Sequence, residues 1–333
     1  MWAAQWQIGT SNNSSKFRCS YSLHLSSDYY RFRISRYRVV AKKFPIMNVT
    51  EKILREIANN KTGAVFYYAN GGNGGDALIN VGFYFLAENI GLTYEAINLE
   101  GLSGLEPGDT VIVAGGGTIV PEWQATSRFL SSLSKHRDIN LLILPQSIRE
   151  VDAVLKNLPE NTRIICREKY SYQYCLSLLP PHKVLLGDDV AFYVDVARLN
   201  KLPTTWGRLD WKNITRHLIY FYHKLKSKFV RKINAFRCDA EASSNLKVKR
   251  KIYDDISVVA ALGSNTQEDS IRSAQRILSL VNLYDELHTD RLHVGIAACL
   301  LGKKVTLHEN SYYKIKGVYE LSMSNFSHAK LVK

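Results

Sequence analysis

Cysteine is scarce in this chain of 333 residues, and its five cysteines include no CxxC pair. Their number is odd, their spacing is irregular and no histidine cluster lies near them, which indicates reduced thiols rather than disulfide bonds or metal ligands. Long apolar runs are also missing. None reaches the roughly 18 residues that would span a bilayer, and no hydrophobic signal segment follows Met1. We therefore expect a cytoplasmic protein without a metal ion.

Acidic residues are scarce in two segments, and the excess of positive charge lies there. The formal net charge is +14 at pH 7, but residues 1–46 and 201–251 together carry more than this, so the other residues sum to a slightly negative charge. This distribution argues against a protein that is basic over its whole surface. No recognised nucleic-acid motif accompanies the charge, so we expect no nucleic-acid partner.

Residues 1–46 are rich in Ser, Tyr and Arg and show no clear hydrophobic periodicity of a helix or a strand. Met47 follows them and directly precedes Asn48-Val49-Thr50-Glu51, a typical helix start in which Asn48 or Thr50 caps the amino end. We expect residues 1–46 to be a non-globular leader or the product of a misplaced start. An Arg-rich targeting peptide is the alternative that this composition leaves open.

After Met47 the chain alternates between short apolar runs and helical patterns. Runs such as residues 63–69, 109–114 and 140–144 fit buried parallel strands that end in turn residues. Such alternation predicts a parallel sheet with helices on both faces. It breaks near residue 201 and resumes near residue 254. The sequence thus predicts two α/β lobes, residues 47–200 and 254–333, with a cleft between them.

Residues 201–253 form a basic linker between these lobes, with an amphipathic pattern from Ile214 to Phe236. One side of the expected helix is apolar: Ile214, Leu218, Phe221, Leu225, Phe229 and Ile233. Its other side is basic: Arg216, Lys224, Lys226, Lys228, Arg231 and Lys232. This pattern suits an acidic partner or a membrane surface with anionic lipid. We therefore predict that residues 214–233 make a peripheral contact at the inner membrane face. Alternatively, the apolar side packs on the protein's own domains.

Two glycine-rich turns follow expected strands. The first is Asn70-Gly71-Gly72-Asn73-Gly74-Gly75-Asp76, which leads into a helical pattern, and the second is Gly115-Gly116-Gly117-Thr118. A strand, a glycine turn and a helix point backbone N–H groups at a phosphate or carboxylate. The first turn fits neither the GxGxxG fingerprint nor a Walker loop. We interpret both turns as parts of a binding site; the alternative is that their glycines only relieve steric crowding.

The segment from His288 to Gly302 is the most chemically suggestive. His288-Thr289-Asp290-Arg291-Leu292-His293 reads as a strand end and a tight turn, and a small apolar helix follows. Ligands of open α/β sheets bind where strand carboxyl ends meet helix amino ends. Arg291 could hold an anion there and His293 could move a proton. Alternatively, Arg291 pairs with Asp290 and His293 caps the helix. We expect His288 and Asp290 to shape the turn.

Eight short motifs, in this order, resemble those of the polysaccharide pyruvyl transferase family, and most closely its bacterial exopolysaccharide-synthesis members. They span about residues 60 to 320: Gly72-Asn73-Gly74-Gly75-Asp76-Ala77-Leu78-Ile79, Gly115-Gly116-Gly117-Thr118, Leu144-Pro145-Gln146-Ser147-Ile148, Arg167-Glu168 with Ser171, Asp189-Val190-Ala191-Phe192, Arg237-x-Asp239-x-Glu241, Thr289-Asp290-Arg291-Leu292-His293 and Asn310-Ser311-Tyr312-Tyr313-Lys314.

This resemblance implies a GT-B-like α/β fold, with two Rossmann-type lobes that carry parallel sheets and a cleft between them. It also implies transfer of pyruvate from phosphoenolpyruvate to a sugar of a polysaccharide or its lipid-linked precursor, which forms a cyclic ketal without a further cofactor. The second lobe is short for a GT-B fold. Two other functions stay open: a nucleotide-sugar glycosyltransferase with the same fold, and a non-catalytic glycan-binding or scaffold protein.

A donor with a carboxylate and a phosphate suits two Arg side chains, and we assign Arg291 and Arg237 to it. His293 is the acid–base candidate because imidazole exchanges a proton near neutral pH. Asp76 is a candidate base for the acceptor hydroxyls, and Asp189 is either a second base or a helix cap. The expected substrate-binding residues also include Asn73, Gly74, Gly75, Gly116, Gly117, Gln146, Tyr312 and Lys314.

Overall fold

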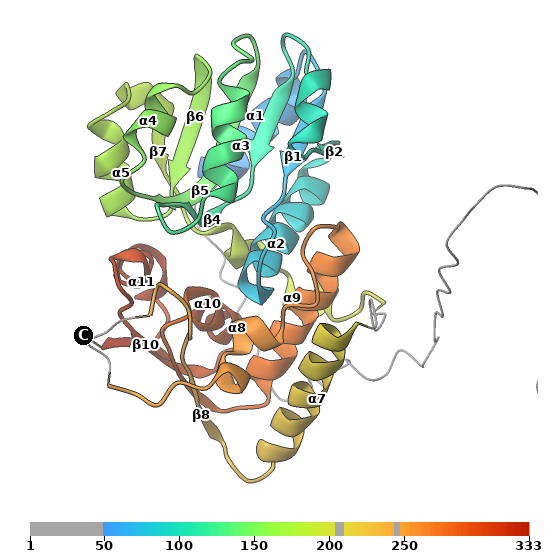
Figure 1. Ribbon diagram of the computed structural model, residues 1–333, viewed down its shortest axis with the longest axis vertical. Helices are drawn as coiled ribbons and strands as arrows, with labels where there is room; N and C mark the ends of the chain where they lie inside the picture. The colour runs from blue at the N-terminus through green and yellow to red at the C-terminus, as the bar shows by residue number, and fades with distance from the viewer. Residues whose placement is uncertain (1–48, 204–209, 243–246, 333) are drawn as a thin grey trace, which may run out of the picture.

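Two parallel sheets organise the protein (Figure 1). The computed structural model describes residues 49–203, 210–242 and 247–332. The first sheet has seven strands in the order β2-β1-β3-β5-β6-β7, with β4 paired to β5, and the second has four in the order β11-β10-β9-β8. The strands are β1 (Val65–Tyr68), β2 (Glu95–Ala96), β3 (Thr110–Val113), β4 (Gly116–Ile119), β5 (Asn140–Ile148), β6 (Asn161–Cys166), β7 (Val184–Leu186), β8 (Lys232–Ala235), β9 (Glu286–Thr289), β10 (Lys304–His308) and β11 (Ala329–Val332).

Helices connect these strands, so the α/β class with parallel sheets is confirmed. They are α1 (Val49–Asn60), α2 (Gly74–Ile90), α3 (Ala125–Leu133), α4 (Asp152–Lys156), α5 (Lys169–Leu176), α6 (Val196–Leu199), α7 (Trp211–Lys226), α8 (Ile256–Val259), α9 (Gln267–Asn282), α10 (Leu292–Leu300) and α11 (Lys314–Val318). Short turns of helix are η2 (Glu100–Gly104), η3 (Pro181–Lys183), η4 (Val190–Tyr193), η5 (Ile252–Asp254) and η6 (Tyr319–Met323).

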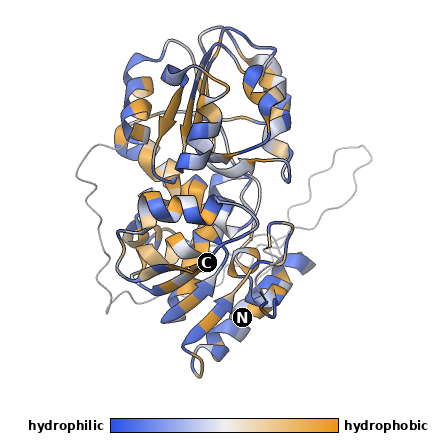
Figure 2. Ribbon diagram, turned by 90° about the vertical axis from the view of Figure 1, so that its left-hand side faces the viewer, coloured by the Kyte–Doolittle hydropathy of each residue, from blue (hydrophilic) through white to orange (hydrophobic). Residues whose placement is uncertain are grey.

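The strands of the first sheet are hydrophobic and lie between helices of mixed polarity (Figure 2). β3 illustrates this, because all four of its residues are buried. A parallel strand covered on both faces needs such a continuous apolar run. Within the described ranges, no helix has the length and apolar character needed to cross a membrane.

The strand order reverses between β1 and β3. β1 pairs with β2 on one side and with β3 on the other, so the chain runs outward from β1 to β2, returns to β3 and continues outward to β7. Ligands of open parallel sheets bind at the carboxyl ends of the strands beside such a reversal. The two glycine-rich turns, residues 70–75 and 115–117, lie at these ends of β1 and β3.

β5 is longer than the sequence indicates. We expected a strand over residues 140–144 that closes at Pro145, but β5 continues to Ile148. Its register against β6 shifts between Ile143 and Gln146, and β4 pairs with β5 beyond this shift. Proline has no N–H to donate, so it is tolerated where a ladder of hydrogen bonds is already interrupted. The extension places Gln146 and Ser147 at the same end of the sheet as the glycine turns.

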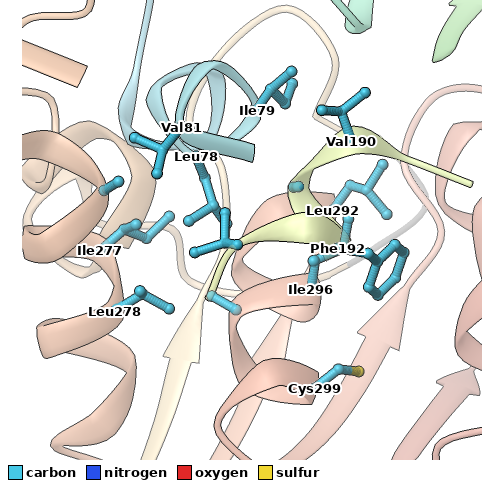
Figure 3. Packing of buried hydrophobic residues seen from close by; sticks show 14 of the residues in the cluster. Leu78, Ile79, Val81, Val190, Phe192, Ile277, Leu278, Leu292, Ile296 and Cys299 are labelled. Carbon is cyan, nitrogen blue, oxygen red and sulfur yellow. The ribbon is translucent and has the colours of Figure 1, made fainter. Parts of the chain in front are cut away.

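Helix α2 joins the two halves of the protein. Nearly all of its residues from Gly74 to Ala87 are buried, and it packs against α9 of the C-terminal half. Its backbone approaches η4 so closely that a Cβ on Gly82 would lie 2.1 Å from the carbonyl oxygen of Val190. Figure 3 shows Leu78 of α2 in the same cluster as Ile277 of α9 and Ile296 of α10. One hydrophobic core therefore runs through both halves and determines how the two sheets lie relative to each other.

The amphipathic segment differs from the expected helix in its bounds, and the structure shows which way its apolar side faces. Helix α7 begins at Trp211 and ends at Lys226, and the chain then turns into β8, the edge strand beside β9. Ile233, expected on the apolar side of the helix, is a buried residue of β8. The prediction of a helix to Phe236 was wrong because pairing with β9 extends this part of the chain. Leu218 and Leu225 face solvent, so for these residues the structure contradicts the alternative that the apolar side of the helix packs on the protein's own domains.

Candidate functional site

Polar side chains from both halves line one cavity of about 280 Å³. The first half contributes the turns after β1 and β3 and the residue after β6. The second half contributes the segments after β8 and β9 and the start of α11. Four of the lining side chains are cations: Arg167, Arg237, Arg291 and Lys314. The same lining includes the carboxylates of Asp76, Asp239 and Glu241, so an anionic ligand would depend on the N–H groups of the cations that these carboxylates do not occupy.

Arg167, Asp189 and His293 form one group, in which Arg167 and His293 line the cavity and Asp189 lies buried behind them. The guanidinium of Arg167 donates to Oδ2 of Asp189 at 2.7 Å and to the Ser147 hydroxyl at 2.9 Å. Nε2 of His293 lies 3.4 Å from the same Asp189 oxygen and 3.5 Å from Nη1 of Arg167. Burial by itself would raise the pKa of Asp189, but Arg167 and His293 outweigh it and hold that pKa below its ordinary value. Asp189 is therefore an anion that orients the side chains of Arg167 and His293.

Asp189 also caps a helix, as we considered from the sequence. Its Oδ1 accepts a hydrogen bond from the N–H of Ala191 at 2.9 Å, at the start of η4. Oδ1 of Asp189 thus caps the helix, while Oδ2 contacts Arg167 and His293. The pairing with Arg167 and His293 is a long-range contact that local sequence cannot show.

Arg291 is held by two carboxylates. Its Nε and Nη2 donate to Asp255 at 3.0 and 2.6 Å, and Nη2 also lies 2.7 Å from Asp239. Burial would lower its pKa, but Asp255 and Asp239 outweigh this effect and raise the pKa above its ordinary value. The partner that the sequence suggested, Asp290, instead accepts from the backbone N–H of Arg237 at 2.7 Å. Asp290 therefore shapes the turn, and Arg291 is positioned by other segments.

Arg237 and Lys314 converge on Glu241. Both donate to Oε2 of this buried carboxylate, and the indole N–H of Trp123 donates to Oε1 at 2.7 Å. Burial opposes the charge of Glu241, but Lys314 and Arg237 outweigh it and lower the pKa to about 2. Burial also lowers the pKa of Lys314 to about 8, although Glu241 counteracts part of this effect. Since Trp123 follows β4 and Lys314 begins α11, this cluster ties the two halves together at the cavity.

Two buried hydrogen-bond donors near Gly117 have no partner among the described residues. They are Nη2 of Arg167 and the hydroxyl of Tyr312. A Cβ on Gly117 would lie 2.8 Å from Nη2 of Arg167, 3.5 Å from the Tyr312 hydroxyl and 3.2 Å from Cδ of Lys314. An unsatisfied buried donor costs about 1–3 kcal/mol, so a native site that holds two of them beside each other indicates a ligand with acceptor atoms.

The glycine turn after β1 forms the amino end of α2. Asn73 caps this helix by accepting from the N–H of Gly75 at 2.8 Å, and Oδ2 of Asp76 accepts from the N–H of Asn73 at 2.9 Å. This reciprocal capping box uses one oxygen of Asp76 and leaves Oδ1 with no protein partner in the described part of the chain. A Cβ on Gly75 would lie 2.7 Å from Nδ1 of His293, so this glycine allows the close approach of α10.

The structure brings together most of the side chains predicted from the sequence. Those that line the cavity are Asn73, Asp76, Gly117, Arg237, Arg291, His293 and Lys314. The lining does not include Gly74, Gly75, Gly116, Gln146 or Tyr312. Gly74 packs against α8, and Gln146 donates to the carbonyl of Ala114 at 2.8 Å and so holds the second glycine turn. Gly116 has a φ of 130°, a conformation that favours glycine.

Five functional candidates were not assigned to the site from the sequence, although three of them lie in the motifs that carry the family resemblance: Arg167, Asp239 and Glu241 lie in motifs, and Trp123 and Asp255 do not. Arg167 had a usable signal, because the pair Arg167-Glu168 directly follows a strand, as the glycine turns do. Trp123 and Asp255 had none, since they reach the site only through the packing of the two halves. No group of three or more His, Cys, Asp or Glu side chains in the described residues could hold a metal ion.

Comparisons with known proteins agree with this arrangement. A family model described as polysaccharide pyruvyl transferase matches residues 13–312, a range that includes most of the segment we expected to be a leader. A search of curated proteins finds no match. Among solved structures, an uncharacterised protein of Klebsiella pneumoniae subsp. pneumoniae is 25% identical with a TM-score of 0.64, and the alignment covers 85% of this chain and 96% of that one. Since the family model spans most of its length, the chain belongs to the polysaccharide pyruvyl transferase family and is a transferase enzyme.

Proposed function

We propose that this enzyme transfers pyruvate from phosphoenolpyruvate to two hydroxyls of one sugar and forms a cyclic ketal. The observation that carries the proposal is the pair of unsatisfied buried hydrogen-bond donors at Gly117, a residue that lines the cavity together with four cationic side chains. Phosphoenolpyruvate carries a carboxylate and a phosphate, whose oxygens would satisfy these donors. The proposed acceptor is a sugar of an exopolysaccharide or of its lipid-linked precursor, and the proposed location is the cytoplasm.

In this proposal, phosphoenolpyruvate is contacted directly by Arg167, Tyr312 and Lys314. Burial raises the pKa of Tyr312 above its ordinary value, so its hydroxyl keeps its proton and stays a donor. Arg237 and Arg291 supply further positive charge, although carboxylates already bind their guanidinium groups. The part that we first assigned to Arg291 and Arg237 is therefore shared with Arg167, which has a free N–H.

His293 acts as the general acid. It gives a proton to the methylene carbon of the donor, which becomes a methyl group, and the adjacent carbon becomes electron-poor. One acceptor hydroxyl adds to that carbon, the carbon–oxygen bond to phosphate breaks, and the second hydroxyl adds to close the ketal. Each acceptor hydroxyl loses one proton. One of these two protons replaces the proton that the methylene carbon received, and the other leaves with phosphate. Asp189 positions the imidazole for this transfer, and Oδ1 of Asp76 is the proposed base for a hydroxyl.

A GT-B-like relation between the halves is part of the proposal. Two parallel sheets contribute the carboxyl ends of their strands to one cavity, which supports it, although the second sheet has only four strands. A nucleotide-sugar glycosyltransferase is the alternative with this type of fold, because fold does not determine function. The compact cavity of about 280 Å³, with cations on several sides, favours the smaller three-carbon donor.

Phosphate release and ligand stabilisation test the proposed function together. With purified full-length enzyme, we expect phosphoenolpyruvate to raise the melting temperature and nucleotide sugars to leave it unchanged. We also expect phosphate release that depends on a glycan acceptor, with one ketal-linked pyruvate found on the product by mass spectrometry. Stabilisation and sugar transfer by a nucleotide sugar, without phosphate release from phosphoenolpyruvate, would establish the alternative.

The lowered pKa of Lys314 predicts how the binding of phosphoenolpyruvate depends on pH. The lowered pKa of about 8 means that the ammonium is present below this pH and is lost as the pH rises through it. We expect kcat/KM for phosphoenolpyruvate, which reports the free enzyme, to fall above about pH 8. In Lys314→Arg the cation persists, so the fall moves to higher pH. Identical pH profiles of the two enzymes would show that another group controls the decline.

A further inference from the structure

Helix α7 packs on the protein with its polar side. The residues that it buries are Asn213, His217, Tyr220 and His223. The Tyr220 hydroxyl lies 2.8 Å from the Ser279 hydroxyl of α9, and Nδ1 of His223 lies 2.6 Å from the Tyr284 hydroxyl. An amphipathic helix on a soluble protein usually buries its apolar stripe. Here hydrogen bonds hold the polar side inward, so the apolar side is left outside.

The outward side of α7 presents large apolar side chains at helical spacing. Trp211 is 84% exposed, Leu218 64% and Leu225 58%, and Phe229, in the turn that follows the helix, is 80% exposed. Positions 211, 218 and 225 are seven residues apart, so they lie along one stripe of the helix surface. Contiguous exposed apolar surface of this kind marks an interaction site. Figure 1 shows α7 in the C-terminal half, away from the first sheet.

The charge beside this stripe restricts what can cover it. Residues 211–232 contain no Asp or Glu, and seven of them are Lys or Arg. Three of these, Lys212, Lys224 and Lys228, are exposed and form no ion pair within the described residues. A second copy of this chain would bring like charges together across a two-fold interface. Residues 1–46 of the same chain are also basic, with eight Lys or Arg and one acid. The positive charge beside the stripe therefore disfavours a second copy of the chain and residues 1–46 as its binding partner, and it favours an anionic one.

We propose that the outward side of α7 and the turn at Phe229 bind the surface of a bilayer that contains anionic lipid. Apolar side chains would enter the boundary between headgroups and acyl chains, and flanking lysines would reach the headgroups with their aliphatic stems along the bilayer. Trp211 suits this boundary because an indole is apolar with one polar edge. The inference goes beyond the transfer reaction and does not depend on it. It would bring the enzyme to the membrane on which a lipid-linked acceptor is held.

Vesicle flotation of the full-length chain tests this proposal. We expect the enzyme to float with vesicles of phosphatidylcholine and phosphatidylglycerol, to float poorly with phosphatidylcholine alone, and to dissociate as salt is raised. Leu218→Glu should weaken binding to the vesicles about tenfold or more, because it removes one apolar side chain that would enter the bilayer and adds a negative charge. The double variant Lys224→Glu/Lys228→Glu should weaken it by at least about fivefold per lysine.

Matched variants on the first half separate this surface from nonspecific effects. Leu99→Glu changes a side chain that is 49% exposed, and Lys135→Glu/Lys156→Glu reverses two exposed lysines elsewhere. Both should bind vesicles like the unchanged enzyme. All variants keep residues 1–46, so any binding by that segment cancels in the comparison. Activity with a soluble acceptor should be the same in every variant, which also shows that each one folds.

Two outcomes would overturn the proposal. The first is equal flotation of the unchanged enzyme and both α7 variants. The second is a dimer in sedimentation measurements that Leu218→Glu dissociates, together with no flotation of the unchanged enzyme, since a second copy would then cover the stripe. A lack of transferase activity would contradict the proposed function and leave the flotation result standing.

Discussion

His293→Asn should slow pyruvyl transfer by about 10²–10⁴-fold while phosphoenolpyruvate still stabilises the protein against heat. Asparagine keeps a polar side chain beside Asp189 but cannot deliver a proton to carbon, and a positioned general acid contributes a factor of this size. The measurement is acceptor-dependent phosphate release. A second readout is deuterium entry into the methyl group of the product in D₂O, which should slow together with phosphate release.

The matched control is His288→Asn, in the same strand-to-helix segment. His288 lies 3.0 Å from Glu286 and 3.3 Å from His308, and it does not line the cavity. We expect its variant to retain nearly full activity. If both variants transferred pyruvate at the rate of the unchanged enzyme, His293 would not be the acid.

Gly117→Ala should reduce kcat/KM for phosphoenolpyruvate by about 10- to 100-fold, the value of one charge-assisted hydrogen bond. The new methyl group would lie 2.8 Å from Nη2 of Arg167, where the proposal places a donor oxygen. Arg167 cannot move aside easily, because it is fully buried and bonded to Ser147 and Asp189. Arg167→Lys should give a similar loss, since it keeps a positive charge but removes Nη2.

Gly104→Ala is the control for the glycine substitution, because a Cβ at Gly104 has no neighbour within 4 Å. Arg163→Lys is the control on β6, where Arg163 pairs with Glu56 away from the cavity. Melting temperatures of all four variants establish that they fold. An unchanged kcat/KM in Gly117→Ala would mean that phosphoenolpyruvate does not bind at the unsatisfied N–H of Arg167 and the hydroxyl of Tyr312.

The predicted strands agree well with those in the structure, and the reason is local. Residues 63–69 and 109–114 contain β1 and β3, because a continuous apolar run between turn residues has few alternatives to a buried parallel strand. The predictions were wrong where a tertiary contact decided the outcome. β5 passes through Pro145 because β4 pairs with it, and α7 ends at Lys226 because the following residues pair with β9.

The site shows the same division. Arg291 and His293 were selected because they follow an expected strand end, whereas Arg237 and Lys314 were selected from the family motifs and the charge of phosphoenolpyruvate. All four line the cavity. Their partners were not foreseen, since Asp255 and Asp189 lie 36 and 104 residues from the side chains that they hold. Sequence patterning reports short periods and turns, whereas these pairs form only after the two sheets pack.

By itself, the sequence determined the parallel α/β class, the glycine turns at strand ends and the family resemblance, because each depends on residue type and short spacing. Only the tertiary structure decided which side of α7 faces solvent, because Tyr220 and His223 form hydrogen bonds with Ser279 of α9, with Tyr284 just after it and with Tyr253 of η5. It also decided which hydrogen-bond donors near Gly117 lack a partner among the described residues. Arg167 and Tyr312 come from different halves, and they meet at Gly117 because α2 and α9 share one core.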